Sequence, residues 1–163
     1  MRTDSGLWRH YSGEKFTLDR YFNYFNHLPL KLFKPYGLWV SEESSDDGWK
    51  SWCLREAFRT DRLNFEYEVQ FVERANILHI KTPEALEDFN RKFLCYLPDT
   101  TIDFIDWRSV GDLFDGILIA PYQDAYRLIF DWYYPWDCAS GCIWNLSAIA
   151  SLKLVNQLQE MEI

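Results

Sequence analysis

The stretch FEYEVQFVERANILHIKTPEALEDFNRKF, residues 65–93, decides the fold class. Residues 65–72 alternate apolar and polar side chains, which predicts a strand, and residues 76–81 are predicted to continue it. A helix is predicted next and is expected to end at Pro98-Asp99. Thr82 is a good N-cap, and Pro83 and Glu84 suit the first turn. Leu86, Phe89 and Phe93 follow at helical spacing and form an apolar stripe that is expected to be buried.

The sequence on both sides of this stretch predicts more strands than helices. Short apolar or alternating segments predict strands at residues 7–11, 38–40, 117–120 and 127–134. Helical spacing predicts one or two helical turns over residues 49–56. A last helix is predicted after a loop at 135–142, with Asn145 or Ser147 as its cap and with a buried stripe of Ile149, Leu152, Val155 and Leu158. Strands come first, helices lie between them and several strands come late, without a regular strand–helix–strand alternation, so the predicted fold class is α+β.

Length and charge limit the domain organisation and the partners. The 163 residues fit one domain, 1–163, and the net charge of −8 argues against tight nonspecific binding of nucleic acid. The apolar run 117–122 is far shorter than a bilayer requires, and residues 1–6 have no apolar signal core. We therefore expect a cytoplasmic protein with no membrane partner.

The remaining composition argues against several kinds of site. The sequence has no Gly-x-Gly-x-x-Gly motif and no P-loop motif, so a Rossmann cofactor site is not expected. Of four cysteines only Cys138 and Cys142 are close together, which favours buried free thiols over a metal site. Aromatic residues make up 18% of the chain, and such side chains fill cores or line pockets for flat ligands.

Two short motifs carry a resemblance to a known family. They are Trp8-Arg9-His10-Tyr11-Ser12 and Tyr36-Gly37-Leu38-Trp39-Val40-Ser41. Together they resemble the first two active-site motifs of ADP-ribosyltransferases of the histidine–tyrosine–glutamate class, a family that includes toxins. The resemblance implies a split, mostly antiparallel sheet with flanking helices, and a single catalytic domain that uses NAD as its substrate.

The resemblance also implies roles for individual residues. His10 would bind the nicotinamide-side ribose, the backbone of Tyr11 and Ser12 would contact the carboxamide, and Trp39 stands where the family has a tyrosine that stacks on nicotinamide. Gly37, Leu38 and Ser41 would shape the second strand of the NAD site. Arg9 is an alternative ribose contact, because another transferase class uses arginine there. Neighbouring strand residues point to opposite faces, so we expect only one of Arg9 and His10 to enter the cleft.

The sequence departs from the family at the acidic residue. The family places a glutamate on a late strand, where it faces the positive charge that develops as nicotinamide leaves. The predicted strand at 117–120 has no glutamate. We take Asp137 as the first candidate to replace it, with Asp115 and Gln123 as alternatives.

The resemblance therefore implies an enzyme, a glycosyltransferase that cleaves the nicotinamide–ribose bond and moves ADP-ribose to a macromolecular acceptor. The acceptor is a protein or a nucleic acid, and a neutralising partner protein would fit a toxin. An NAD glycohydrolase is the same chemistry with water as the acceptor. A noncatalytic acidic interaction or immunity protein is the rival from another class. A nucleic-acid acceptor would need a local basic strip, for which the candidates are Arg55, Arg59 and Arg62.

Overall fold

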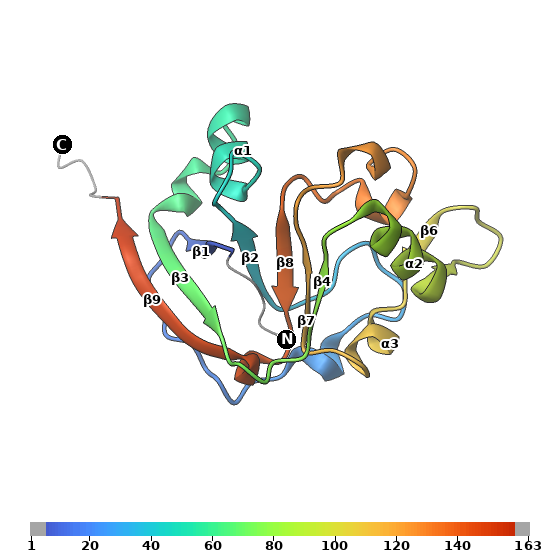
Figure 1. Ribbon diagram of the computed structural model, residues 1–163, viewed down its shortest axis with the longest axis horizontal. Helices are drawn as coiled ribbons and strands as arrows, with labels where there is room; N and C mark the ends of the chain where they lie inside the picture. Colours follow the sequence, from blue (N-terminus) through green and yellow to red (C-terminus); the bar gives the residue numbers. More distant parts are fainter. Residues whose placement is uncertain (1–5, 159–163) are drawn as a thin grey trace.

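A seven-stranded sheet organises residues 6–158, the part of the chain that the computed structural model describes. The strands lie in the order β4-β7-β8-β2-β1-β3-β9, which Figure 1 shows from right to left. Their bounds are β1 Trp8–Ser12, β2 Leu38–Glu42, β3 Phe65–Phe71, β4 Ile77–Ile80, β7 Gly116–Ile119, β8 Ser140–Ile143 and β9 Ile149–Gln157. Every neighbouring pair is antiparallel except β4 and β7. The α+β class with a mostly antiparallel sheet is therefore confirmed.

The parallel pair β4 and β7 is joined by a crossover that carries most of the helical structure. This crossover contains α2 Pro83–Phe93, the two-stranded sheet of β5 Leu94–Tyr96 and β6 Asp103–Ile105, and α3 Trp107–Gly111. Thr82 caps α2 as predicted, because its hydroxyl accepts a hydrogen bond from the Ala85 amide. The predicted end at Pro98-Asp99 is wrong, because the chain turns into β5 directly after Phe93.

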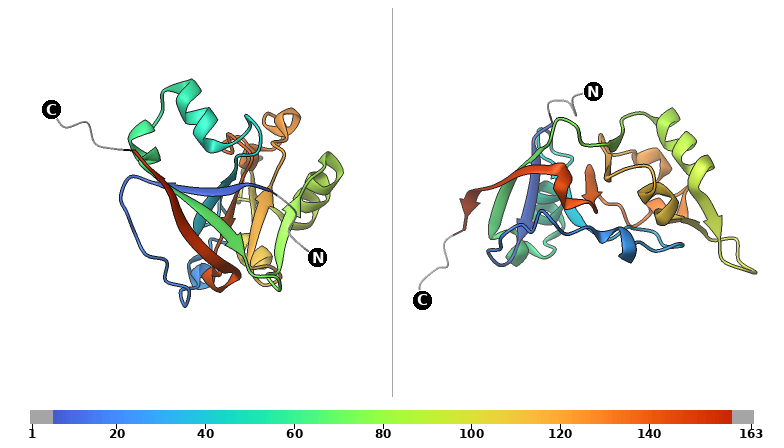
Figure 2. Two further views of the ribbon diagram at one scale, coloured as in Figure 1. Left: turned by 60° about the vertical axis from the view of Figure 1, so that its left-hand side comes forward. Right: turned by 90° about the horizontal axis from the view of Figure 1, so that it is seen from below.

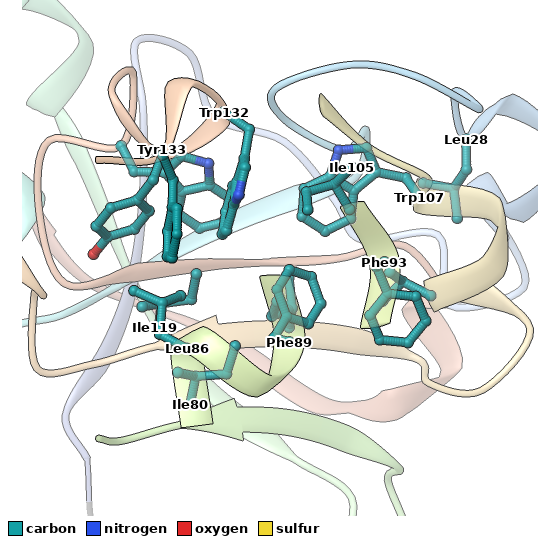
Figure 3. Close-up of a cluster of buried hydrophobic side chains, with 14 of the residues drawn as sticks. Leu28, Ile80, Leu86, Phe89, Phe93, Ile105, Trp107, Ile119, Trp132 and Tyr133 are labelled. Atoms are coloured by element: carbon teal, nitrogen blue, oxygen red, sulfur yellow. The ribbon is translucent and has the colours of Figure 1, made fainter. Parts of the chain in front are cut away.

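The larger core lies between the crossover and one face of the sheet. Figure 3 shows Phe89 and Phe93 of α2 packed towards Trp107, Trp132 and Ile105. The helical spacing of residues 86, 89 and 93 brings all three side chains inward, and each is buried. Four tryptophans are almost fully buried in this cluster: Trp107, Trp132, Trp136 and Trp144. Much of the aromatic content thus fills a core.

A second, smaller core covers the opposite face of the sheet. It includes Trp8, Val40, Val69, Leu118 and Ile143. Strand β7 is buried at all four positions because its residues alternate between the two cores, with Ile117 and Ile119 in the first. The central strands are consequently held from both sides.

The single α-helix outside the crossover, within residues 6–158, is α1 Trp49–Glu56, with the predicted bounds. In Figure 1 it lies above the end of β2, whereas α2 lies to the right of β4, and Figure 2 gives two further views of both helices. The rings of Trp49 and Trp52 stack with centroids 5.2 Å apart, and Cys53 is buried. The three arginines of this region are exposed: Arg55 in the last turn of α1, and Arg59 and Arg62 after it.

Four predictions about the sheet are wrong. Residues 77–80 do not continue β3 but form β4, at the opposite end of the sheet order. Residues 127–134 contain no strand; short 3-10 helices lie at Asp124–Tyr126 and Asp131–Tyr133. The predicted loop 135–142 contains the start of β8, and the predicted last helix is the strand β9. Asn145 caps only a short 3-10 helix, Leu146–Ala148.

No helix in the described part of the chain has the length and apolar character needed to cross a bilayer.

Candidate functional site

A cavity of about 250 Å³ lies on the face of the sheet that carries α1. Strands β1 and β2 form its floor, Trp49 of α1 lies on one side, and the segment that leads into β8 lies on another. The six predicted site residues that line it are Arg9, His10, Tyr11, Trp39, Ser41 and Asp137. Five further residues line it: Lys34, Val40, Trp49, Cys138 and Ser140.

Arg9 and His10, neighbours on β1, are both among the residues that line the cavity. The ladder between β1 and β2 consists of the pairs Trp8↔Glu42 and Arg9↔Ser41. Beyond Arg9 the two strands no longer pair, and the ring of His10 bonds to the backbone of β2 in their place.

The environment of His10 fixes its protonation state. Its Nδ1 lies 2.6 Å from the carbonyl oxygen of Trp39, which can only accept, so Nδ1 carries the proton. The rings of Phe16 and Tyr67 pack against the imidazole. Burial lowers the pKa of His10, and the hydrogen bond to Trp39 opposes that effect only in part. At neutral pH the imidazole is therefore neutral, with the proton on Nδ1 and with Nε2 as a hydrogen-bond acceptor.

Trp39 is half-buried, and side chains from two other segments of the chain contact its ring. Trp136 packs against it edge-on, with ring centroids 5.1 Å apart. The Nζ of Lys34 lies over the ring, 5.3 Å from its centroid. Pairing with Cys142 in β8 fixes the position of Trp39 along β2. An aromatic surface therefore lines the cavity, and an ammonium group covers part of it.

Asp137 is the only one of the three late candidates that lines the cavity. Its carboxylate lies 3.6 Å from Nη2 of Arg127. Burial raises the pKa of Asp137, and the charges of Lys34 and Arg127 act against that rise. The Asp137 carboxylate is therefore partly removed from water and lies in the field of two cations, Lys34 and Arg127.

Asp115 and Gln123, the other two candidates, are used elsewhere in the fold. Asp115 accepts hydrogen bonds from the Asn76 amide at 3.0 Å and from Nδ2 of Asn145 at 2.9 Å, and so joins β4 to the end of β8. Gln123 is buried, and its backbone amide donates to the hydroxyl of Tyr133. Neither lines the cavity.

Three predicted site residues of the two motifs also stay outside the cavity lining. The hydroxyl of Ser12 donates to the carbonyl of Glu14 in the turn after β1. Leu38 points to the second core. A Cβ on Gly37 would lie 2.4 Å from the carbonyl oxygen of Ile143, so the glycine is required for close contact between β2 and β8. These three shape the strands and do not line the site.

A polar network supports the rim of the cavity near Tyr11. The Tyr11 hydroxyl donates to Oε1 of Glu66 at 2.7 Å, and Ser41 Oγ donates to Oε1 of Glu43 at 2.7 Å. The same Glu43 oxygen accepts the amide of Lys50 in the first turn of α1. The network ties β1, β2, β3 and α1 together beneath the cavity opening.

Sequence reasoning missed Lys34 and Trp49. Lys34 lies in the turn before β2, and its place over Trp39 depends on the tertiary fold, so no spacing signal could have found it. Trp49 was predicted only as the first residue of a short helix, and its place beside the cavity depends on where the fold positions that helix.

The cysteines give the cavity no nucleophile. All four are free thiols, and Cys138, which lines the cavity, is buried. Burial raises the pKa of Cys138 to about 12, so the reactive thiolate is not formed near neutral pH. Among residues 6–158, no three His, Cys, Asp or Glu side chains are grouped to hold a metal ion.

Comparisons of this chain with family models, with curated proteins and with solved structures found no match. The cavity is therefore the feature from which a function can be inferred.

Proposed function

We propose that the chain is an NAD-dependent mono-ADP-ribosyltransferase, which cleaves the nicotinamide–ribose bond and passes ADP-ribose to a macromolecular acceptor. One observation carries this proposal. His10, Trp39 and Asp137 come from three segments far apart in the sequence, and all three line the same cavity. A noncatalytic core would give no reason for a histidine, an indole and a carboxylate to meet at one opening.

The size and lining of the cavity fit one end of NAD. A volume of about 250 Å³ is at the small end for ligand pockets and suits a single ring with its sugar better than a whole dinucleotide. The rest of NAD would lie along the surface. Only two residue pairs join β1 to β2 within the single seven-stranded sheet.

The residues present suit cleavage of a glycosidic bond. Trp39 offers a flat apolar surface for the nicotinamide ring, and neutral His10 offers an acceptor to a ribose hydroxyl. As nicotinamide leaves with the bonding electron pair, positive charge develops on the ribose, and the Asp137 carboxylate would stabilise that charge. The acceptor nucleophile then forms the new bond to the ribose carbon.

Incubation with NAD and measurement of free nicotinamide tests the proposal. We expect release by the wild type and a fall of about 100-fold or more in His10→Ala, as loss of a group that orients the reacting sugar predicts. His27→Ala is the matched control, because His27 lies outside the cavity and packs on Phe22. No release in the presence of any protein or nucleic-acid extract would refute the proposal. Release without an added acceptor would identify an NAD glycohydrolase.

A noncatalytic binding module is the second candidate, and a specific observation favours it. Strand β8 contributes no carboxylate, and the one acid in the cavity is already paired with Arg127. Such a chain would bind NAD or a related ligand without cleaving it. Saturable binding of NAD with no nicotinamide release would favour this candidate over the transferase.

A further inference from the structure

The Lys34 side chain occupies the part of the cavity that a ligand ring would need. Its Nζ lies over Trp39, 5.3 Å from the ring centroid, and the residue lines the cavity together with Trp39 and Asp137. Lys34 is half-buried, and of the charges near it Asp137 does most to stabilise its ammonium. An indole face and a carboxylate thus hold an ammonium group supplied by the chain itself.

The same two groups are those that recognise organic cations. An aromatic face attracts a cation through its quadrupole, most strongly with tryptophan and where water is excluded. A nearby carboxylate adds direct Coulomb attraction, which is stronger in a partly desolvated site than in bulk water. Burial lowers the pKa of Lys34, because the ammonium loses hydration in the cavity, and the attraction of Asp137 offsets only part of that loss.

We propose that the cavity is a binding site for a flat organic cation, such as an N-alkylpyridinium ring, and that Lys34 is an internal competitor which a ligand must displace. The four-carbon stem of lysine lets the ammonium leave while the backbone before β2 stays in place. The inference deepens the proposed function, because the nicotinamide ring of NAD is such a cation. Lys34 would then determine how tightly the site binds a cationic ring relative to a neutral one.

Binding of two small rings tests this without any bond cleavage. The probes are 1-methylnicotinamide, which carries a positive ring, and nicotinamide, its neutral counterpart. The measured quantity is the ratio of their dissociation constants, obtained by calorimetry or by ligand-observed NMR. Lys34→Met keeps the length of the stem and removes the charge, so we expect the ratio to shift by about tenfold in favour of the cation. Lys34→Arg keeps the charge and is expected to retain the wild-type ratio.

A second substitution shows whether Asp137 attracts the cation. In the Lys34→Met background, Asp137→Asn is expected to return the ratio to within about threefold of the wild-type value. Thermal unfolding of each variant confirms that it is folded, and Lys34→Gln replaces Lys34→Met if the latter is not. The proposal is overturned if the ratio moves less than about twofold in both neutral variants, if Lys34→Arg moves it equally, or if neither ring binds.

The outcomes separate this inference from the proposed function. A shifted ratio with no nicotinamide released from NAD leaves the cation site standing and refutes the transferase. Nicotinamide release with an unchanged ratio supports the transferase and refutes the role of Lys34.

Discussion

Replacing Gly141 with alanine should strain the centre of the sheet. Gly141 lies in β8, paired with Val40 of β2 on one side and with Leu118 of β7 on the other. A Cβ at this position would lie 2.3 Å from the carbonyl oxygen of Ile117 and 2.9 Å from Cα of Leu118. Both are backbone atoms of a fully buried strand, so neither can move without shifting β7.

The expected loss of stability follows from that geometry. Overpacking a buried site costs about 1–3 kcal/mol, and two backbone contacts place this one in the upper half of the range. Alanine also lowers the conformational entropy of the unfolded chain, which stabilises the folded state by about 0.4–1 kcal/mol. The net loss in the free energy of unfolding is therefore about 2 kcal/mol. For a chain of this length that loss corresponds to a fall in Tm of about 4–8 °C.

Thermal and urea unfolding of Gly141→Ala and Gly13→Ala measure the effect. Gly13 is the matched control, because the nearest atoms to its Cβ position, in Asp61 and Arg62, are 3.7 Å away. We expect Gly13→Ala to change the free energy of unfolding by no more than about 0.5 kcal/mol. If the two variants unfold at the same temperature, the tight contact between β7 and β8 is not a property of the folded chain.

Three more predictions follow from burial. Burial holds the pKa of His10 below its usual 6.5, so as the pH falls the imidazole is protonated at a higher pH in the unfolded chain than in the folded one. The free energy of unfolding therefore decreases as the pH drops below about 6.5. In His10→Gln the fall in Tm between about pH 7.5 and pH 5 should be smaller than in the wild type. Trp132→Ala should lower the free energy of unfolding by about 3–5 kcal/mol in urea titrations, whereas a loss below about 1 kcal/mol would contradict the packing of that buried ring. With a thiol reagent at neutral pH, the native protein should label fast only at Cys95, the one cysteine that is not buried, and fast labelling of Cys138 would contradict its burial.

The sequence predicted those elements whose signals are local. The bounds of α1 and the start of α2 were right because capping residues and helical spacing act within a few positions. Strands β1, β2, β3 and β7 were also found, because short apolar or alternating runs reflect faces that are buried in the fold.

The failures share a cause in long-range packing. Phe130, Tyr133 and Trp136 are three residues apart and pack inward through 3-10 turns, yet the mixture of aromatic and β-branched residues around them also suits a strand. The stripe from Ile149 to Leu158 suggests a helix, but pairing with β3 makes this segment a strand. Small residues at 139–141 look like a turn, whereas β8 needs them because β7 and β2 approach it so closely.

The candidate site was predictable in its composition but not in its electrostatics. The two motifs placed His10 and Trp39, and the aromatic loop pointed to Asp137; the structure brings these three together. The cations beside Asp137 come from Lys34 and Arg127, which are far apart in sequence and showed no pattern. Proximity between distant loops is set by the fold and not by local spacing.

Calorimetric titration of NAD into the wild type and into Trp39→Ala tests the central claim most directly. We expect one saturable site for NAD in the wild type. Binding to Trp39→Ala should be at least about tenfold weaker, because the indole surface of the cavity is lost. At 100 times the dissociation constant, NAD should also stabilise the wild type by roughly 2.7 kcal/mol. Absence of binding, or equal binding by the two proteins, would contradict the claim that this cavity receives the nicotinamide end of NAD.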